Sequence, residues 1–318
     1  MNHKLIHELQ PGDSVLSFYI VRKKEVKEQR RNRELYITFD LGDPSGRIRG
    51  SVWDNIDEVN SAIHVHDIVR VKGKVISYHD SPHISIERIR KTTADDNVDP
   101  AQFLPTNDLN VEALFEQMLQ YIQGVENKYL HQLLMLIFGN PKFAEQFRNG
   151  TAAKLWHHNY VGGLLEHTLS LVHICDTLAS HYQLNRDLAV TAALLHDIGK
   201  LSELSADGYF EYTTQGRLLG HITMGAQYIQ AKITQVKDFP NSLRLHLLHC
   251  ILSHHGSHEH GSPVVPMTRE AMILHYADEL DSKIGAFDRI MKKEAEPGKE
   301  WSNYVNLLDR FLFIGGVE

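Results

Sequence analysis

Hydrophobic and polar residues alternate along five short stretches in the first 93 residues of the chain. A period of two is the pattern of β-strands that bury one face. In the fourth stretch every odd position from 69 to 75 is Val or Gly, and every even position from 70 to 74 is Arg or Lys. Gly73 would lie where a strongly curved strand bends. We therefore predict five strands, near 15–21, 35–41, 48–53, 68–76 and 84–89.

The connections between these strands point to one architecture. Residues 43–46 read Asp-Pro-Ser-Gly, a turn sequence between the second and third strands. Residues 55–66 are long enough for a short helix between the third and fourth strands. The order β-β-β-α-β-β is that of an OB-fold. We expect residues 1–93 to form an N-terminal all-β OB-fold barrel.

The pattern becomes helical beyond a segment rich in Asp, Asn, Pro and Thr, which we interpret as a linker over 94–110. Apolar residues then recur at helical spacing, with no strand pattern of comparable quality. We expect an all-α second domain over 111–318. Its predicted helices lie near 111–123, 127–138, 141–148, 160–182, 186–198, 216–236, 241–253 and 268–293.

Length and composition agree with two soluble domains. At 318 residues, of which 42% are hydrophobic, the chain can bury two cores. No apolar run approaches the roughly 20 residues of a membrane-spanning helix, and the polar start lacks the core of a signal peptide. We expect a cytoplasmic protein without a membrane partner. Cys175 and Cys250 form no C-x-x-C pair and are interpreted as buried thiols.

Charge is distributed unevenly between the two parts. The net charge is −7, but residues 1–93 carry 16 Lys and Arg against 13 Asp and Glu, or +3. Residues 94–318 carry 17 against 27, or −10. This balance excludes a protein that coats nucleic acid over its whole surface, and it makes the first domain the candidate for nucleic-acid contact.

Two predicted helices of the second domain have candidate metal-binding side chains, one within its apolar face and the other at its end. His167 falls within the apolar stripe of the helix near 160–182, where an imidazole needs partners. The helix near 186–198 ends on His196 and Asp197. Gly199 would provide an αL cap, and Lys200 would lie at the negative end of the helix dipole.

Further candidates follow in the order His…His-Asp…His…His-His…Asp: these are His221, His254, His255 and Asp278. Imidazole and carboxylate ligands suit Mn²⁺, Fe²⁺, Co²⁺ or Zn²⁺, with Mn²⁺ favoured, and the lack of thiolates argues against a structural zinc site. Two such cations about 3.5–4 Å apart can activate water and stabilise charge on a phosphate. We therefore expect a metal-dependent phosphodiesterase with one or two ions.

The stretches AAKLWHHNYVGGLLEHTLSL, LLHDIGK, GRLLGH, LSHHG and HYADELDSK resemble HD-domain metallophosphohydrolases. Together with the OB-fold they resemble the YhaM-type 3′→5′ exoribonuclease family, which joins an OB-fold to an HD domain. The resemblance implies that His167, His196, Asp197 and Asp278 hold the principal metal. It leaves His221 and His254 for a second ion bridged by Asp197, with His255 as the alternative to His254. Lys200 resembles a lysine that approaches the phosphate, so Asp197 and Lys200 are the expected catalytic residues.

Basic residues of the first domain could hold a strand. The run over 22–33 is expected in the loop between the first two strands, which borders the nucleic-acid groove of an OB-fold. Tyr36 could stack on bases, and Trp53 could do so or belong to the core. His157 and His158 could line the substrate cleft or lie in a solvated loop. The predicted nucleic-acid-binding side chains are Arg22, Lys23, Lys24, Lys27, Arg30, Arg31, Arg33, Tyr36, Arg47, Arg49, Arg70, Lys72 and Lys74.

We expect a 3′→5′ exoribonuclease that hydrolyses single-stranded RNA to nucleoside 5′-monophosphates, with single-stranded DNA as a further candidate substrate. The 3′→5′ polarity is implied only by the resemblance. One alternative is an HD hydrolase of nucleotides or cyclic dinucleotides, for which a polymer-binding OB-fold has no obvious use. Another is a non-catalytic nucleic-acid-binding replication or regulatory factor with a structural metal. The sequence leaves the preference for RNA or DNA and the oligomeric state open.

Overall fold

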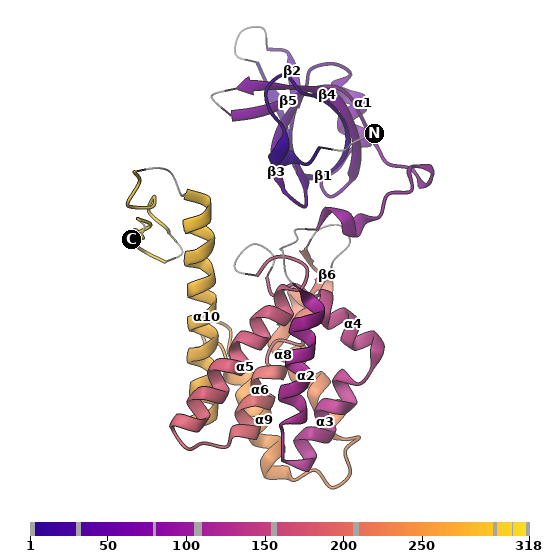
Figure 1. Cartoon of the computed structure of the whole chain (residues 1–318). Coiled ribbons are helices and arrows are strands. Elements are labelled where there is room, and N and C mark those ends of the chain that lie inside the picture. Colours follow the sequence, from indigo (N-terminus) through magenta and orange to yellow (C-terminus); the bar gives the residue numbers. More distant parts are fainter. Residues whose placement is uncertain are drawn as a thin grey trace. The chain divides into compact units, whose positions relative to one another are not determined.

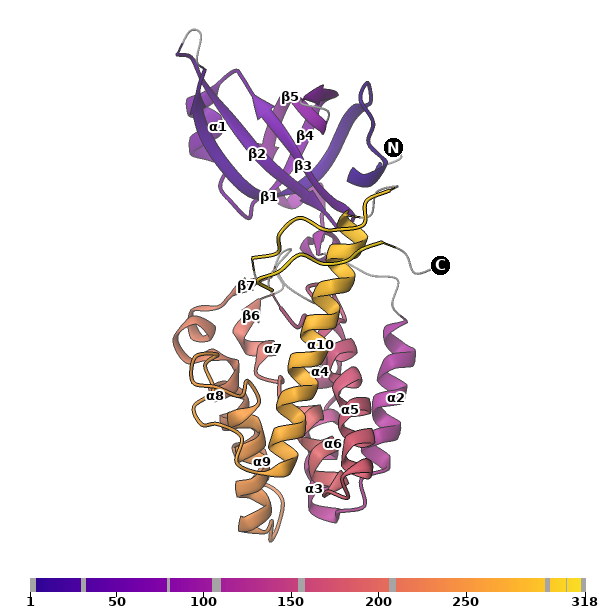
Figure 2. The same cartoon turned by 90° about the vertical axis from the view of Figure 1, so that its left-hand side faces the viewer.

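The computed structural model describes residues 4–29, 33–78, 81–104, 110–153, 158–205, 210–294, 298–306 and 308–315. The chain divides into two compact units (Figures 1 and 2). The first comprises Met1–Asp108 with Ser205–Glu211, and the second comprises Leu109–Leu204 with Tyr212–Glu318. Each unit has its own hydrophobic core.

The first unit contains a closed five-stranded barrel, which confirms the predicted OB-fold (Figure 1). Its strands are β1 (Ser14–Glu28), β2 (Leu35–Asp43), β3 (Gly46–Val52), β4 (Ile68–Tyr78) and β5 (Ser81–Lys91). They close in the order β1-β2-β3-β5-β4, and only β3 and β5 pair in parallel. The predicted short helix is α1 (Ile56–Ala62), and single turns of 3₁₀ helix are η1 (Ile6–Glu8), η2 (Ala94–Asp96) and η3 (Pro100–Phe103).

The residues of β4 alternate between buried and exposed positions, as predicted. The valines at 69, 71 and 75 are buried, whereas Lys72 and Lys74 are exposed. Gly73 follows a register shift against β5, and a Cβ there would lie 2.3 Å from the carbonyl oxygen of Ser85. The bend therefore requires a residue without a side chain.

The prediction that the basic run 22–33 lies in a loop is wrong for its first part, because β1 continues to Glu28. This strand pairs with β4 from Ser14 to Ile20 and with β2 from Ile20 onward, with an irregularity at Arg22. One long strand thus passes from one neighbour to the next, which is how a five-stranded barrel closes on itself.

The second unit is helical, as predicted. Its helices are α2 (Val111–Gln123), α3 (Lys128–Phe138), α4 (Pro141–Asn149), α5 (Gly163–His181), α6 (Arg186–Leu195), α7 (Lys200–Glu203), α8 (Thr214–Ile233), α9 (Asn241–Ser253) and α10 (Arg269–Glu294). The predicted helix near 186–198 ends at Leu195 as α6, and the short helix α7 that follows it was not predicted. A pair of two-residue strands, β6 (Leu204–Ser205) and β7 (Glu211–Tyr212), is too short to produce a period in the sequence.

Asparagine side chains fix the beginning of several of these helices. Asn110, Asn127, Asn140 and Asn185 each accept a hydrogen bond from a backbone N–H in the first turn of α2, α3, α4 and α6.

α6 is buried along 188–195, and α10 packs against α5, α6 and α9 (Figure 2). The end of α6 therefore lies inside the protein. Among the described residues no helix is long and apolar enough to cross a membrane.

Candidate metal centre

The end of α6 carries the His-Asp pair into the interior. His196 follows the last residue of the helix, and its Nδ1 donates to the carbonyl oxygen of Ala193 at 2.8 Å. Both His196 and Asp197 are buried. Gly199 does not form the predicted αL cap, because its φ is −64°. It is needed for close packing instead, since a Cβ there would lie 2.0 Å from the carbonyl oxygen of His221.

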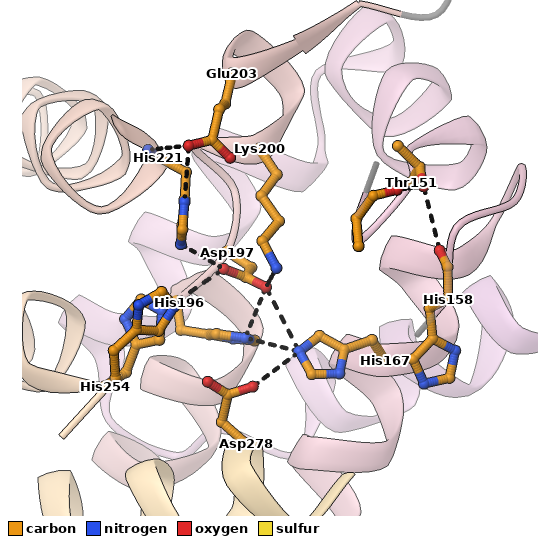
Figure 3. A network of polar contacts seen from close by, with 12 residues as sticks. Thr151, His158, His167, His196, Asp197, Lys200, Glu203, His221, His254 and Asp278 are labelled. Carbon is orange, nitrogen blue, oxygen red and sulfur yellow. Dashed lines mark hydrogen bonds and ion pairs between the residues drawn. The ribbon is translucent and has the colours of Figure 1, made fainter. Parts of the chain in front are cut away.

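One group of donors forms where α5 and α10 meet this pair (Figure 3). His167 Nε2 lies 3.3 Å from His196 Nε2, 3.3 Å from Asp278 Oδ1 and 3.5 Å from Asp197 Oδ2. The donor atoms of His167, His196 and Asp278 lie within 4.8 Å of one another, close enough to share one ion. The structure thus brings together the four residues predicted for the principal metal.

A second group forms on the other oxygen of Asp197. His221 follows a break in α8 at Gly220, where φ is 70°, and His254 follows the last residue of α9. Their Nε2 atoms lie 3.4 and 3.7 Å from Asp197 Oδ1. The donor atoms of His221, His254 and His255 lie within 4.8 Å of one another. Both histidines of the ambiguous pair therefore belong to this group.

The orientation of the imidazole rings fits a divalent cation. His196 and His254 donate from Nδ1 to carbonyl oxygens, so their Nε2 atoms carry lone pairs toward Asp197. Asp197 Oδ1, His221 Nε2 and His254 Nε2 are buried without a hydrogen-bond partner. Leaving a buried polar atom unsatisfied costs about 1–3 kcal/mol. Converging nitrogen lone pairs and carboxylates are the ligand set of a transition-metal site, with nitrogen and oxygen donors and no thiolate.

Opposite charges stabilise one another in this interior. Burial disfavours the charged form of His167, yet the carboxylates of Asp197, Asp278 and Asp281 raise its pKa well above the ordinary value. Lys200 Nζ lies 2.5 Å from Asp197 Oδ2. Although burial opposes it, Asp197 also raises the pKa of Lys200, which is therefore a cation at neutral pH. The centre therefore combines ionised carboxylates with two groups that these carboxylates favour as cations, His167 and Lys200.

Three residues around the centre were not predicted from the sequence. Asp281 accepts a hydrogen bond from His167 Nδ1 at 2.7 Å, and Glu203 accepts one from His221 Nδ1 at 3.1 Å. Glu166 lies 2.8 Å from His158 Nδ1. Asp281 had a usable signal, because it follows Asp278 by one helical turn and so shares its face of α10. Glu203 and Glu166 had none that separates them from surface carboxylates.

His158, predicted for the substrate cleft or a solvated loop, is largely buried and lies beyond His167, on the side away from Asp197 and Asp278 (Figure 3). Its ring lies 2.8 Å from Glu166 and 3.1 Å from Asp281. Burial opposes charge on His158, but these two carboxylates raise its pKa. His157 lies outside the described residues.

The barrel carries a separate aromatic and basic pocket of roughly 380 Å³. Its lining includes Lys23, Lys27, Tyr36, Arg49, Trp53 and Tyr78. Trp53 is 47% exposed, so it does not belong to the core. Its ring stacks on Tyr36 with centroids 4.4 Å apart and planes inclined by 14°. Glu25 bridges Lys23 and Lys27, whose ammonium groups lower its pKa to about 2. Aromatic rings beside cations are the composition of a nucleic-acid-binding surface, with rings for bases and cations for phosphates.

Other basic side chains predicted to bind nucleic acid lie elsewhere on the barrel. Arg22 donates to the carbonyl oxygen of Phe103 at 3.1 Å. Lys24 donates to two carbonyl oxygens, one inside α1 and one on the residue that follows it. Arg70 and Lys72 line a different groove of roughly 580 Å³. Arg47 borders a third, of roughly 660 Å³, which Arg49 shares, while Lys74 is simply exposed on β4. Arg33 is almost fully exposed, and Arg30 and Arg31 lie outside the described residues.

Comparison with known proteins agrees with both units. Residues 164–283 match the model of the HD domain, and residues 20–92 match that of the OB-fold nucleic acid binding domain. A protein of Listeria monocytogenes serotype 4b named 3′-5′ exoribonuclease YhaM is 32% identical over 315 residues, covering 99% of each chain. Its namesakes in Bacillus licheniformis and in a Geobacillus species are each 33% identical. The match to the Bacillus licheniformis protein covers 98% of both chains, and the match to the Geobacillus protein covers 93% of this chain and 90% of the relative. The chain therefore belongs to the family of YhaM 3′-5′ exoribonucleases.

Proposed function

We propose that this protein is a metal-dependent exoribonuclease that shortens single-stranded RNA from its 3′ end to nucleoside 5′-monophosphates. The observation that carries the proposal is the convergence of His167, His196, His221 and His254 on Asp197, with buried donor atoms left unsatisfied. The relatives named 3′-5′ exoribonuclease match almost the whole chain, which supports both the substrate class and the polarity.

The residues present can hold two ions, for which Mn²⁺ is the favoured metal. His167, His196, Asp197 and Asp278 would hold one, and His221 with His254 or His255 would hold the other, with Asp197 between them. Such ions lower the pKa of bound water and neutralise charge on a phosphate. Asp197 suits a bridging role because its two oxygens face different groups, Oδ2 toward His167 and Oδ1 toward His221.

Lys200 is the group of this site that would stabilise charge on the reacting phosphate. Its ammonium reaches Asp197 Oδ2 at 2.5 Å, so it lies beside the donor atoms without being a metal ligand itself. A fixed cation directed at developing negative charge stabilises a transition state more than a ground state. We assign Lys200 this role and leave the positioning of the ions to the histidines and carboxylates.

The barrel would hold the strand upstream of the cut. The free face of Trp53 can stack on one base, because Tyr36 covers the other face. Lys23, Lys27 and Arg49 line the same pocket, where cations can meet phosphates of the strand. Stacking is tolerant of base identity, so this unit would confer affinity for single strands and little sequence preference.

Product analysis tests the proposal. Metal-depleted protein is reconstituted with Mn²⁺ and incubated with three substrates: single-stranded RNA labelled at its 5′ end, DNA of the same sequence, and a cyclic dinucleotide. We expect a ladder of RNA fragments that shorten from the 3′ end, with release of nucleoside 5′-monophosphates. The Asp197→Ala variant, prepared in the same way, controls for contaminating nucleases.

Other product patterns would identify another function. Hydrolysis of the cyclic dinucleotide with intact RNA would show an HD hydrolase of small molecules. Binding of RNA without any product, at full metal content, would show a nucleic-acid-binding factor. Faster shortening of DNA than of RNA would move the substrate class, and release of label from the 5′ end would reverse the polarity.

A further inference from the structure

Four histidines of the metal centre, of which three are buried and His221 is partly buried, are held in the same orientation by two different kinds of hydrogen bond. Each donates from Nδ1 and directs Nε2 toward Asp197. For two of them the acceptor is a backbone carbonyl oxygen, and for the other two it is a carboxylate. This bond decides which nitrogen faces Asp197, because a neutral ring that donates from Nδ1 keeps its Nε2 lone pair for a metal.

The hydrogen bond to the backbone is local. His196 and His254 each follow the last residue of a helix, and each donates to the carbonyl oxygen three residues earlier, at 2.8 and 2.7 Å. The last carbonyl groups of a helix have no N–H partner within it, so they are free to accept. The place of these two histidines in the chain therefore fixes their ring orientation without help from other elements.

His167 does not use this kind of bond: it lies inside α5, where carbonyl groups already accept from the N–H four residues on. Its Nδ1 donates to Asp281 Oδ2 on α10 at 2.7 Å. Asp281 is itself fixed: His158 Nε2 lies 3.1 Å from the same oxygen, and Ser170 donates to the other. Two residues of α5 and one of the preceding loop thus hold a single carboxylate on α10.

His221 lies at the start of the second segment of α8, where N–H groups rather than carbonyls are free. Glu203 Oε1 accepts from its backbone N–H at 3.0 Å and from its Nδ1 at 3.1 Å. One carboxylate oxygen therefore caps the resumed helix and orients the ring. The backbone of Glu203 also lies close against α8, since a Cβ on Gly216 would lie 2.4 Å from the carbonyl oxygen of Glu203.

We propose that Asp281 and Glu203 are positioning residues, each of which holds one histidine with Nε2 directed at its own ion: Asp281 serves His167, and Glu203 serves His221. The inference rests on the proposed metal centre and assigns its two halves separate supports. His158 and Ser170 act one step further out, by fixing the carboxylate of Asp281. The cluster of His158, His167 and Asp281 is accordingly a hydrogen-bonded support and holds no ion of its own.

Mn²⁺ binding to the metal-depleted full chain tests this assignment without any turnover, by calorimetric titration. The His167→Ala and His221→Ala variants identify which binding event belongs to which group. We expect Asp281→Ala to weaken the event lost in His167→Ala by about 10- to 100-fold, and Glu203→Ala to weaken the event lost in His221→Ala by a similar factor. Asp288→Ala removes an exposed carboxylate from the same helix, α10, and is the matched control.

Conservative variants separate positioning from charge. The amide oxygens of Asp281→Asn and Glu203→Gln can still accept from Nδ1, so these variants should lose less affinity than the alanine variants. Equal losses in the amide and alanine variants would overturn the positioning role. Wild-type affinity in Asp281→Ala, or a loss no larger than that of Asp288→Ala, would overturn it as well.

Two further results separate this inference from the proposed function. If Asp281→Ala does not fold, Ser170→Ala, which removes one donor to Asp281, should still weaken the same binding event by a smaller factor, and an unchanged affinity would count against the proposal. If the wild-type chain binds Mn²⁺ as described but leaves RNA intact, the exoribonuclease proposal fails and the positioning roles stand. If it binds no Mn²⁺ at all, both fail.

Discussion

Replacing Trp53 with Ala should weaken the binding of long RNA and leave the hydrolysis of the shortest substrates unchanged. The ring of Trp53 is 47% exposed, and Tyr36 stacks on one of its faces at 4.4 Å. One face therefore remains for one base. Stacking of a base on an aromatic side chain is worth about 1–3 kcal/mol. At 1.4 kcal/mol for each factor of ten, the dissociation constant should rise roughly 5- to 150-fold.

Fluorescence anisotropy of a labelled 20-nucleotide RNA measures this change with metal-depleted protein, in which the strand stays intact. Trp301→Ala is the matched control, because Trp301 is 55% exposed and belongs to the other unit. In the metal-loaded enzyme KM for the long RNA should rise, while kcat/KM for a dinucleotide should stay at the wild-type value. A dissociation constant that changes no more than in Trp301→Ala would refute the stacking role. Equal loss on long and short substrates would show that Trp53 acts through folding.

Four further predictions concern the centre and the two cores. Asp197→Ala should abolish RNA hydrolysis and lower the Mn²⁺ content, because the two oxygens of Asp197 face both groups of donor atoms, while the circular dichroism spectrum should stay unchanged. Full activity of this variant would show that Asp197 does not belong to the site. Lys200→Ala should lower kcat at unchanged metal content in elemental analysis, and loss of metal would show that it supports a ligand instead. Burial raises the pKa of Cys175 and of Cys250 to about 12, so neither thiol should react with a disulfide reagent at pH 8 until the protein unfolds; rapid reaction of the native protein would contradict their burial. Burial lowers the pKa of His83 below its ordinary value of about 6.5. As the pH falls through 6.5, the unfolded chain therefore binds more protons than the folded chain, and the folded state loses stability. The urea concentration at the midpoint of barrel unfolding should decrease over the same pH range. The His83→Gln variant should flatten this dependence, and an unchanged slope would mean that another group sets it.

The sequence by itself determined the architecture of both units, because each depends on local periodicity. Alternating residues along β4 can bury one face only as a strand, and Gly73 marks the bend that the barrel requires. Apolar residues at helical spacing likewise placed helices such as α3 and α6, while the Asn residues that cap them, Asn127 and Asn185, became apparent only in the structure. The ordered His and Asp residues also pointed to the candidate metal centre, since the resemblance to the HD domain carries their spacing and their side chains are typical metal ligands.

Tertiary structure alone decided how these residues are supported. The sequence separation between His167 and Asp281 is 114 residues, and only the packing of α5 against α10 brings Nδ1 within 2.7 Å of the carboxylate. Gly199 matters through the approach of the His221 carbonyl, not through its own φ.

The same holds for the basic residues of the barrel. A lysine looks alike in the sequence whether it faces solvent or a carbonyl group. Only the closed barrel distinguishes the two neighbouring lysines. Lys23 lines the same pocket as Trp53, whereas Lys24 donates hydrogen bonds to carbonyl oxygens at the end of α1. Periodicity is a property of neighbouring residues and is therefore written in the sequence, whereas contacts between distant segments exist only once the chain has closed on itself.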